Sequence, residues 1–197
     1  MKSDETVSEL LKKRGGYLTA KEAREEGVSN KDLQRLATRG NLERAAHGLY
    51  VSEDVFPDTY YIAQYRCPQG VFSHETALFI HGLCDRVPVR LMMTIPSGWN
   101  TPLLKDEGFK FFYCGPKRMG LGVCEIEMVS GVKVRTYDAE RTLCDCVKYV
   151  DQLDRDLIIT GLKRYIKGDE KDSAKLLDYA SLLNVRDIVY RYLEVLS

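Results

Sequence analysis

Basic and amide side chains recur in the segment SNKDLQRLATR, residues 29–39. Lys and Arg can contact phosphates or guanine, Asn and Gln can pair with adenine, and a Thr methyl can contact the methyl group of thymine. If the segment is a helix, Lys31, Arg35 and Thr38 lie opposite its leucines. The N-terminal end of such a helix enters the major groove first. The segment therefore predicts a DNA-reading helix, whose polar side chains are Asn30, Lys31, Gln34, Arg35, Thr38 and Arg39. The alternative interpretation is that these polar side chains simply form a solvent-exposed helix face.

A short hairpin is predicted directly after this helix. Leu42 alternates with charged residues, residues 46–48 can turn, and residues 49–51 return as a strand. Arg39, Arg44 and His47 would then lie toward the DNA backbone or the minor groove. Because histidine is mostly neutral at physiological pH, the contribution of His47 is expected to be the weakest.

Two further helices are predicted upstream. Val7, Leu10 and Leu11 have helical spacing before a glycine pair, and Thr19 forms a capping box with Glu22. Ser29 is expected to cap the third helix with its hydroxyl. Helices this short must pack together to be stable. Three helices followed by a hairpin is the order of a winged helix-turn-helix.

The charge of the chain supports a local rather than a general attraction to nucleic acid. The chain has 29 Lys plus Arg and 29 Asp plus Glu, so its formal net charge is zero. Residues 1–52 hold ten basic and eight acidic residues, and the acids concentrate before residue 27, apart from the third helix. The positive surface is therefore expected on the third helix and the hairpin. A winged helix used to bind a protein is the alternative, since fold alone does not fix function.

A second domain is predicted after an acidic, proline-containing linker near residues 52–57. We expect a winged helix-turn-helix domain at residues 1–52 and a larger α+β domain at residues 58–197. The larger domain is expected to begin with helices and strands and to end in helices. Helices are expected at 59–65, 73–81, 138–150, 154–167, 173–183 and 185–196, and strands at 91–95, 109–114, 123–129 and 132–136.

Three stretches together resemble a known family. They are GGYLTAKEAREEGVSNKDLQRLATRGNLERAAHGLYV, FSHETALFIHGLCD and VRTYDAERTLCDCVKY, in this order. The arrangement resembles the AbiEi family of bacterial abortive-infection antitoxins over most of residues 7–150. The resemblance implies a non-enzymatic antitoxin of a type IV toxin–antitoxin system in phage defence. Its N-terminal domain would bind inverted-repeat operator DNA and repress its own operon. Its C-terminal domain would counteract a nucleotidyltransferase-like toxin. By position, the resemblance gives the DNA-reading role to the third helix and to Arg44, and it places His47 where relatives carry a basic residue.

Two other groups of residues could suggest a metal site. His74, Glu75 and His81 lack the second histidine four positions after the first that a zinc protease helix requires. A packing helix with Ser73 as its N-cap is the better interpretation. Cys144 and Cys146 would point about 200° apart on a helix, so they cannot share one tetrahedral site. We therefore predict free, largely buried cysteines and no metal or other cofactor.

The loop at residues 97–100, SGWN, follows a predicted strand and could hint at nucleotide binding. A nucleotidyltransferase would also need a closely spaced acid pair for magnesium, and the adjacent Asp106 and Glu107 would point to opposite faces of a strand. The sequence thus argues against an enzyme. Trp99 is interpreted as an anchor, with partner contact as one alternative, because aromatic residues are enriched at interface hot spots.

The segment from Asp138 to Asp145 begins a helix with several charges. Asp138 is expected to cap the helix and Glu140 to favour its N-terminal dipole. Arg141 could pair with Asp145 four residues later, which is usually a structural interaction.

Composition completes these expectations. The six cysteines, in a chain whose N-terminus has no apolar export segment, predict free thiols in a reducing cytoplasm. No apolar run reaches the roughly 18 residues needed to span a membrane, so a soluble protein is expected. A ligand-sensing winged-helix regulator without a toxin partner is the alternative function. It would require a pocket with converging polar groups.

Overall fold

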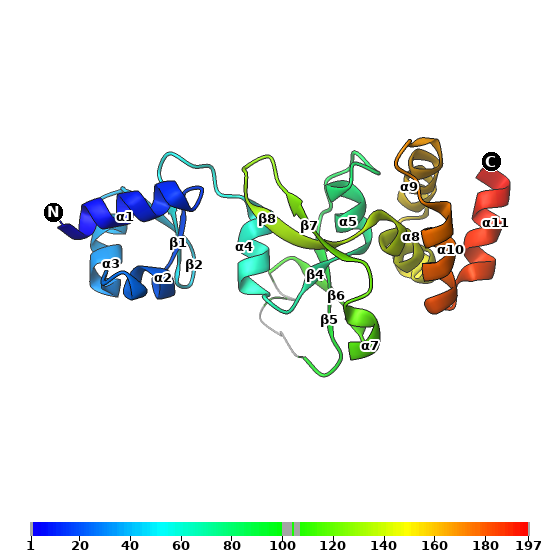
Figure 1. Ribbon diagram of the computed structural model, residues 1–197, viewed down its shortest axis with the longest axis horizontal. Coiled ribbons are helices and arrows are strands. Elements are labelled where there is room, and N and C mark those ends of the chain that lie inside the picture. Colours follow the sequence, from blue (N-terminus) through cyan, green and yellow to red (C-terminus); the bar gives the residue numbers. More distant parts are fainter. Residues whose placement is uncertain (1, 100–103, 105–106, 197) are drawn as a thin grey trace. The chain divides into compact units, whose positions relative to one another are not determined.

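The protein is described by a computed structural model covering residues 2–99, 104 and 107–196 (Figure 1). The chain forms two compact units. Unit 1 consists of Met1–Pro68 and Glu127–Val134, and unit 2 of Gln69–Ile126 and Arg135–Ser197. The structure is mixed α+β, as the sequence predicts. In the part of the chain that the structure describes, no helix combines the length and apolar character that crossing a membrane requires.

Unit 1 contains a winged helix-turn-helix with one more strand than predicted. Its elements are α1 (Lys2–Lys13), β1 (Tyr17–Thr19), α2 (Ala20–Glu25), α3 (Asn30–Thr38), β2 (Leu42–Ala46), β3 (Leu49–Ser52) and α4 (Thr59–Arg66). The three strands form an antiparallel sheet in the order β1-β3-β2. The predicted caps of α2 and α3 are confirmed, since Thr19 and Glu22 make a capping box and Ser29 accepts the amide of Asp32.

Each face of this small sheet has its own apolar cluster. Successive residues of a strand point to opposite faces, so Leu18 and Tyr50 face the helices while Tyr17, Leu49 and Val51 face away. The helix-facing cluster includes leucines of α1 and α3, among them the fully buried Leu33. The opposite cluster is covered by residues of α4 and of the 127–134 segment. Unit 1 therefore extends beyond the hairpin.

Two polar contacts fix the start of α4 in unit 1. Asp58 accepts hydrogen bonds from the amides of Tyr60 and Tyr61 at 2.9 and 3.0 Å, which caps the helix. The other carboxylate oxygen of Asp58 accepts from the Ser130 hydroxyl at 2.5 Å, and its amide donates to the Tyr17 hydroxyl at 2.6 Å. One residue thus connects α4 with the sheet and with the 127–134 segment.

Unit 2 is built on a sheet that includes parallel and antiparallel pairs. Its strands lie in the order β6-β5-β4-β8-β7. β4 is antiparallel to β5 and parallel to β8, and β5 is parallel to β6. The strands are β4 (Val71–Phe72), β5 (Leu91–Pro96), β6 (Phe109–Cys114), β7 (Val123–Glu127) and β8 (Lys133–Tyr137). The short α5 (His74–Ile80) follows β4, and α7 (Pro116–Met119) follows β6.

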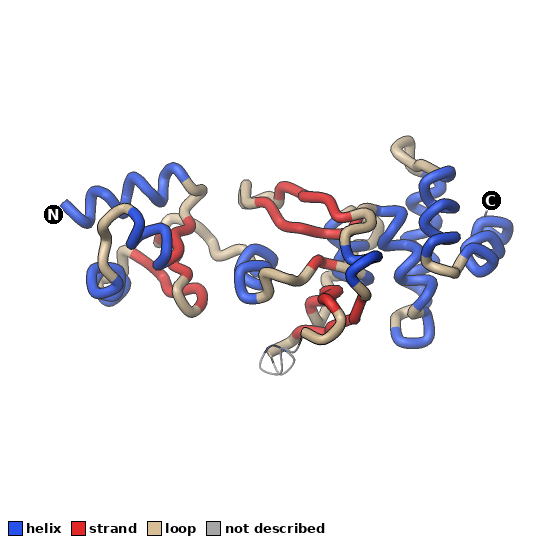
Figure 2. Tube along the Cα trace, turned by 60° about the horizontal axis from the view of Figure 1, so that its bottom comes forward, coloured by secondary structure: helices blue, strands red, loops and turns tan. Residues whose placement is uncertain are grey.

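The C-terminal part of unit 2 is helical within the described range, as predicted, and is drawn in blue in Figure 2. It consists of α8 (Ala139–Lys148), the 3-10 turn η1 (Val150–Gln152), α9 (Arg155–Lys167), α10 (Ser173–Leu182) and α11 (Arg186–Leu196). These helices and α5 share one core that includes Leu78, Leu143, Ile158 and Leu162. Gly161 allows α9 to approach α5 closely, because an added β-carbon would lie 3.1 Å from the Leu78 side chain.

Candidate nucleic-acid interface

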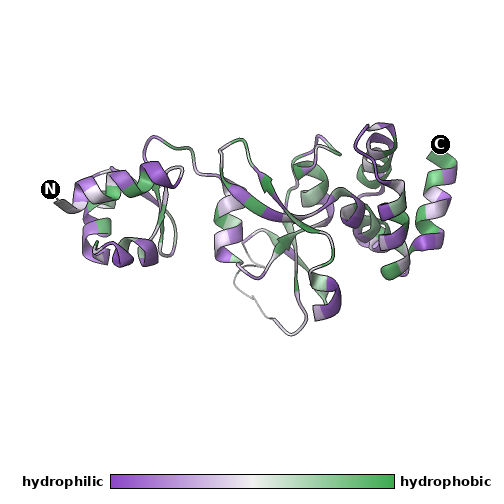
Figure 3. Cartoon of the chain, in the orientation of Figure 1, coloured by the Kyte–Doolittle hydropathy of each residue, from purple (hydrophilic) through white to green (hydrophobic). Residues whose placement is uncertain are grey.

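The helix α3 is built from a cap and a narrow apolar stripe. The Ser29 hydroxyl accepts the amide of Asp32 at 3.2 Å and donates to the Asp32 carboxylate at 2.7 Å. Hydrogen bonding from Ser29 keeps the pKa of Asp32 below its ordinary value, although burial acts the other way. Leu33 and Leu36 are buried, and hydrophilic residues make up most of the remaining helix (Figure 3). This pattern fixes which side of α3 faces solvent.

All six polar residues predicted for the third helix are exposed. They lie in two rows of i, i+4 neighbours, and the rows are Asn30, Gln34 and Thr38, and Lys31, Arg35 and Arg39. The Thr38 hydroxyl donates to the Gln34 carbonyl at 2.9 Å, so its hydrogen bond is satisfied within the helix. Exposure of the full set is the geometric requirement for groove contacts.

Arg35 differs from the other basic residues because it contacts helix α1. Its guanidinium lies 2.7 Å from the Asp4 carboxylate and 3.2 Å from that of Asp32, and it donates to the Ser3 hydroxyl at 3.2 Å. The prediction that the acidic residues lie away from the third helix is therefore wrong for Asp4. The sequence could not show this contact, because it joins two helices that are distant in sequence. By contrast, Lys31 and Arg39 form no ion pair among the described residues.

The wing is short and its turn is held in place. β2 and β3 are joined by His47 and Gly48, and Gly48 has a φ of +74°, which glycine adopts without strain. The Gly48 carbonyl accepts the Ala20 amide at 2.8 Å, and the His47 carbonyl accepts the Tyr65 hydroxyl at 3.2 Å. The exposed Arg44 donates to Nδ1 of His47 at 3.0 Å, since a guanidinium has only donors. The wing thus presents these two predicted side chains together.

The predicted ion pair between Arg141 and Asp145 of helix α8 is confirmed. Asp138 caps α8 by accepting the Arg141 amide at 2.8 Å. The Arg141 and Asp145 side chains form an ion pair at 2.9 Å and are only 2 % and 6 % exposed. Arg141 also donates to two backbone carbonyls, those of Arg118 and Leu121. Its role is therefore structural, in agreement with the interpretation from sequence.

Glu140 lies in the first turn of α8, as expected, and it makes further contacts that the sequence does not predict. Its side chain is buried, accepts a hydrogen bond from the Tyr165 hydroxyl at 2.8 Å and lies 3.0 Å from Nζ of Lys175. Lys175 also lies 3.1 Å from Asp138. Burial alone would lower the pKa of Lys175, but its hydrogen bonds to Glu140 and Asp138 raise that pKa above its ordinary value. This cluster joins α8 to α9 and α10.

The residues considered for a metal site have separate roles. Nε2 of His81 lies 2.6 Å from the Tyr137 carbonyl, and Glu75 accepts the amide of Asp154 at 2.9 Å. Ser73 is the N-cap residue of α5, but its hydroxyl makes no capping bond and instead lies 2.8 Å from Nδ1 of His74. The capping interaction expected for the Ser73 hydroxyl is therefore wrong. Within the described ranges, no group of His, Cys, Asp or Glu has the arrangement of a metal site.

The remaining predicted residues lie in or near the loop after β5. Trp99 is half-buried, and its amide donates to the Pro96 carbonyl at 3.1 Å. Its proposed partner contact stays a prediction. Asn100 of the same loop, and Asp106 of the acid pair considered above, lie outside the described residues. Cys144 and Cys146 are free and buried, as predicted.

Comparison with known proteins gives a family match for the N-terminal region. No curated protein matches the sequence significantly. The crystal structure of the RV2827C protein from Mycobacterium tuberculosis is similar, with 14% sequence identity and a TM-score of 0.57. The match covers 98% of this chain and 80% of that one, and it supports the fold alone. Residues 5–52 match the family described as "Transcriptional regulator, AbiEi antitoxin". The N-terminal region, which carries α3 and the wing, is therefore similar to this family, in agreement with the resemblance seen in the sequence.

Proposed function

We propose that the protein is a non-enzymatic antitoxin that also represses its own operon. Residues 1–52 would bind inverted repeats in the operator, and residues 58–197 would counteract a cognate nucleotidyltransferase-like toxin. The observation that carries the proposal is the family match over residues 5–52, the segment in which α3 exposes six side chains able to contact DNA. Six free cysteines support placing this activity in the reducing cytoplasm.

In the proposed complex, α3 lies in the major groove. Asn30, Lys31 and Gln34, near its N-terminal end, contact base edges, and Thr38 offers its methyl group to a thymine. Arg39 and the wing residue Arg44 contact phosphates. Because the wing has only a two-residue turn, we assign most of the binding free energy to the helix.

Arg35 must exchange partners to contact DNA. An exposed ion pair is screened by solvent and contributes little to stability, so the Asp4 contact is weak enough for a phosphate to replace it. The side chain already lies at the surface of α3, and the exchange requires only a change of rotamer. We therefore assign Arg35 as a phosphate contact, and Asp4 competes with the phosphate for the Arg35 guanidinium.

A double substitution tests the DNA-binding part of the proposal. Lys31→Ala with Arg35→Ala should weaken binding to the upstream DNA at least tenfold. It should also reduce the slope of log affinity against log salt by about 0.9, because Arg35 is the phosphate contact of this pair and each lost phosphate contact removes about 0.9. Fluorescence anisotropy at several salt concentrations measures both quantities. The matched control is Lys163→Ala with Lys167→Ala, which removes two exposed charges at the same i, i+4 spacing from α9.

Equal binding by the two double variants would overturn the assignment of α3 as the DNA-reading helix. The antitoxin part is tested separately by co-expression with a nucleotidyltransferase-like protein, if one is encoded beside this gene. The Lys31 and Arg35 double variant should still rescue growth, since those residues belong to the DNA-binding region. Failure of the unmodified protein to rescue growth would contradict the antitoxin assignment.

A further inference from the structure

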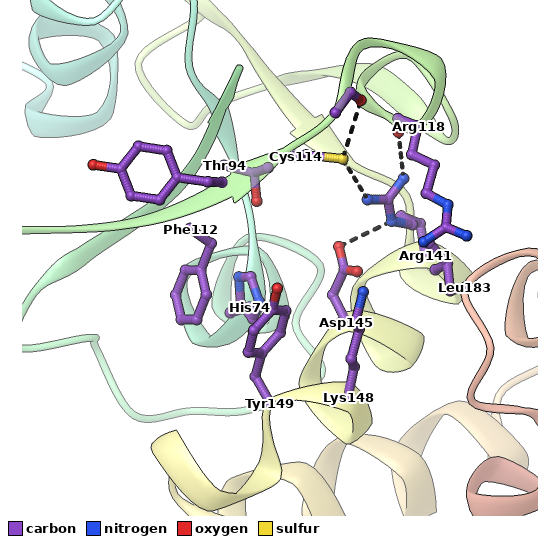
Figure 4. A pocket seen from close by; sticks show the side chains of 12 residues that line it. His74, Thr94, Phe112, Cys114, Arg118, Arg141, Asp145, Lys148, Tyr149 and Leu183 are labelled. Atoms are coloured by element: carbon purple, nitrogen blue, oxygen red, sulfur yellow. Dashed lines mark hydrogen bonds and ion pairs between the residues drawn. The ribbon is translucent and has the colours of Figure 1, made fainter. Parts of the chain in front are cut away.

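Unit 2 contains a cavity of about 140 Å³ between the sheet and helix α8 (Figure 4). Thr94 of β5 and Phe112 of β6 line one side, and Arg141, Asp145 and Lys148 of α8 line the other. His74, the first residue of α5, and Tyr149 complete the inner wall, and Arg118 of α7 lies near Arg141. Residues from five secondary-structure elements therefore converge on one space.

Two buried polar atoms of residues that line this cavity have no hydrogen-bond partner among the described residues. They are Nε2 of His74 and Oγ1 of Thr94, in residues that are 0% and 3% exposed. Buried polar groups are nearly always hydrogen-bonded, so an exception at a cavity indicates a site for a polar ligand. Because both atoms belong to residues that line the same cavity, one ligand could satisfy both.

The orientation of the His74 ring is fixed by its surroundings. Nδ1 lies 2.8 Å from the Ser73 hydroxyl, and the ring stacks on Phe112 with a centroid separation of 3.5 Å. Tyr149 contacts the ring edge-on at 5.3 Å. Burial, together with the nearby cations of Lys110 and α8, lowers the pKa of His74 well below its ordinary value. The ring is therefore neutral and presents a fixed Nε2.

The charges around the cavity favour an anion. Arg118, Arg141 and Lys148 line it with a single carboxylate, that of Asp145, which is already paired with Arg141. The Arg118 guanidinium makes no hydrogen bond or ion pair within the described part of the chain. Nη2 of Arg141 has only a 4.0 Å contact with the Cys114 sulfur. Two positive charges are thus uncompensated, and several N–H donors are available.

We propose that this cavity binds a phosphate group, which contacts the unpartnered polar atoms of Thr94 and His74, while Arg118 and Lys148 supply compensating charge. The volume is close to that of cavities of about 150 Å³ that hold benzene, so the cavity suits a compact group rather than a whole nucleotide. A phosphate carries up to two negative charges and accepts hydrogen bonds on every side, which matches two uncompensated cations and donors on opposite walls. The group can be inorganic phosphate or the phosphoryl end of a larger metabolite.

Titration calorimetry of the full-length protein at constant ionic strength tests the proposal. The probes are inorganic phosphate, AMP, ATP and malonate, a dicarboxylate of similar charge. We expect saturable binding of at least one phosphate probe, with malonate at least tenfold weaker. Affinity for AMP or ATP that is tenfold higher than for inorganic phosphate would identify the phosphoryl end of a nucleotide. Comparable or higher affinity for inorganic phosphate would identify the free ion.

Two substitutions and one control make the test specific. Thr94→Val keeps the side-chain shape and removes the hydroxyl, and Arg118→Gln removes a cation that supports no other side chain. Each should weaken binding at least tenfold. The control, Lys117→Gln, changes the exposed neighbour of Arg118 that does not line the cavity, and it should leave the affinity within twofold.

The folding of each variant is checked by thermal unfolding without ligand. Thr94→Val should unfold no earlier than the unmodified protein, because the hydroxyl that it removes has no partner. The proposal is overturned if no phosphate probe binds saturably or if malonate binds as tightly. It is also overturned if Lys117→Gln weakens binding as much as Arg118→Gln, or if Thr94→Val folds normally and binds unchanged.

Discussion

Two ion pairs in this protein have the same length and spacing but opposite environments. Arg141 and Asp145 of α8 are 2.9 Å apart and nearly inaccessible, at 2 % and 6 % exposed. Arg155 and Asp151 are also 2.9 Å apart and four residues apart, at 68 % and 84 % exposed. Replacing each aspartate by asparagine removes the charge with little change in shape. Comparing the two variants therefore shows how burial changes the contribution of an ion pair to the free energy of unfolding.

The expected effects follow from what each substitution leaves behind. Asp145→Asn leaves the Arg141 guanidinium buried without a compensating charge, which costs about 3–5 kcal/mol when a buried pair is broken. We expect the lower end, about 3 kcal/mol, because the asparagine oxygen can still accept from Nε. Asp151→Asn should change the free energy of unfolding by less than about 0.5 kcal/mol, since its partner stays hydrated.

Burial also acts directly on the buried carboxylate. It raises the pKa of Asp145 above its ordinary value, although the Arg141 guanidinium acts in the opposite direction. The unfavourable desolvation of the carboxylate therefore offsets part of the attraction between the two charges. The net stabilisation from the intact pair is smaller than the loss of stability when one partner is removed.

Urea unfolding followed by tryptophan fluorescence measures the difference. Trp99 is the one tryptophan of the chain and lies in unit 2, so its emission reports on the unit that contains both pairs. With a typical slope of about 2 kcal/mol per molar urea, Asp145→Asn should lower the midpoint by about 1.5 M. Equal shifts for the two variants would refute the reasoning, because burial is the principal difference between the pairs.

Three further predictions concern other parts of the chain. Asp4→Asn should raise operator affinity severalfold in fluorescence anisotropy, because Arg35 loses the nearer of its two competing carboxylates and keeps only Asp32; unchanged affinity would remove Arg35 from the interface. His74 has a lowered pKa, so the unfolded chain binds a proton that the native ring does not. Stability should therefore be complete above pH 6.5 and fall below it by up to about 1.4 kcal/mol per pH unit. Urea unfolding of His74→Asn, whose side chain tolerates the φ of +54°, should show a flatter profile, and an unchanged profile would contradict this role. Gly16→Ala should lower the melting temperature by calorimetry, by more than about 3 °C for a cost above 1 kcal/mol, because its β-carbon would collide with Val55 at a φ of +87°. A melting temperature equal to that of the unmodified protein would show that Val55 moves freely.

Features encoded within a few residues were predictable from the sequence. The caps at Thr19, Ser29 and Asp138 each depend on a side chain that accepts the backbone amide three positions later, and the structure contains each of them. The strands β1 and β4 were missed because two or three residues are too few to show an alternating pattern.

Features assembled from distant segments could not be predicted. The Asp4–Arg35 contact depends on how α1 packs against α3. The cavity in unit 2 depends on side chains from five elements, and no local spacing relates Thr94 to Arg118 or to α8. The sequence draws attention to His74 only as a candidate metal ligand, because the missing hydrogen-bond partner of its Nε2 is apparent only in three dimensions.

The second apolar cluster of unit 1 bears on how the protein matures during synthesis. Tyr17, Leu49 and Val51 pack with Val132, which leaves the ribosome after the strands β5 and β6. The nascent N-terminal region therefore carries an incompletely covered sheet face until residues 127–134 are available, and such transient apolar surface favours aggregation. A fragment ending at Ser52 should share this weakness. The winged helix therefore completes its fold only when much of unit 2 has already been translated.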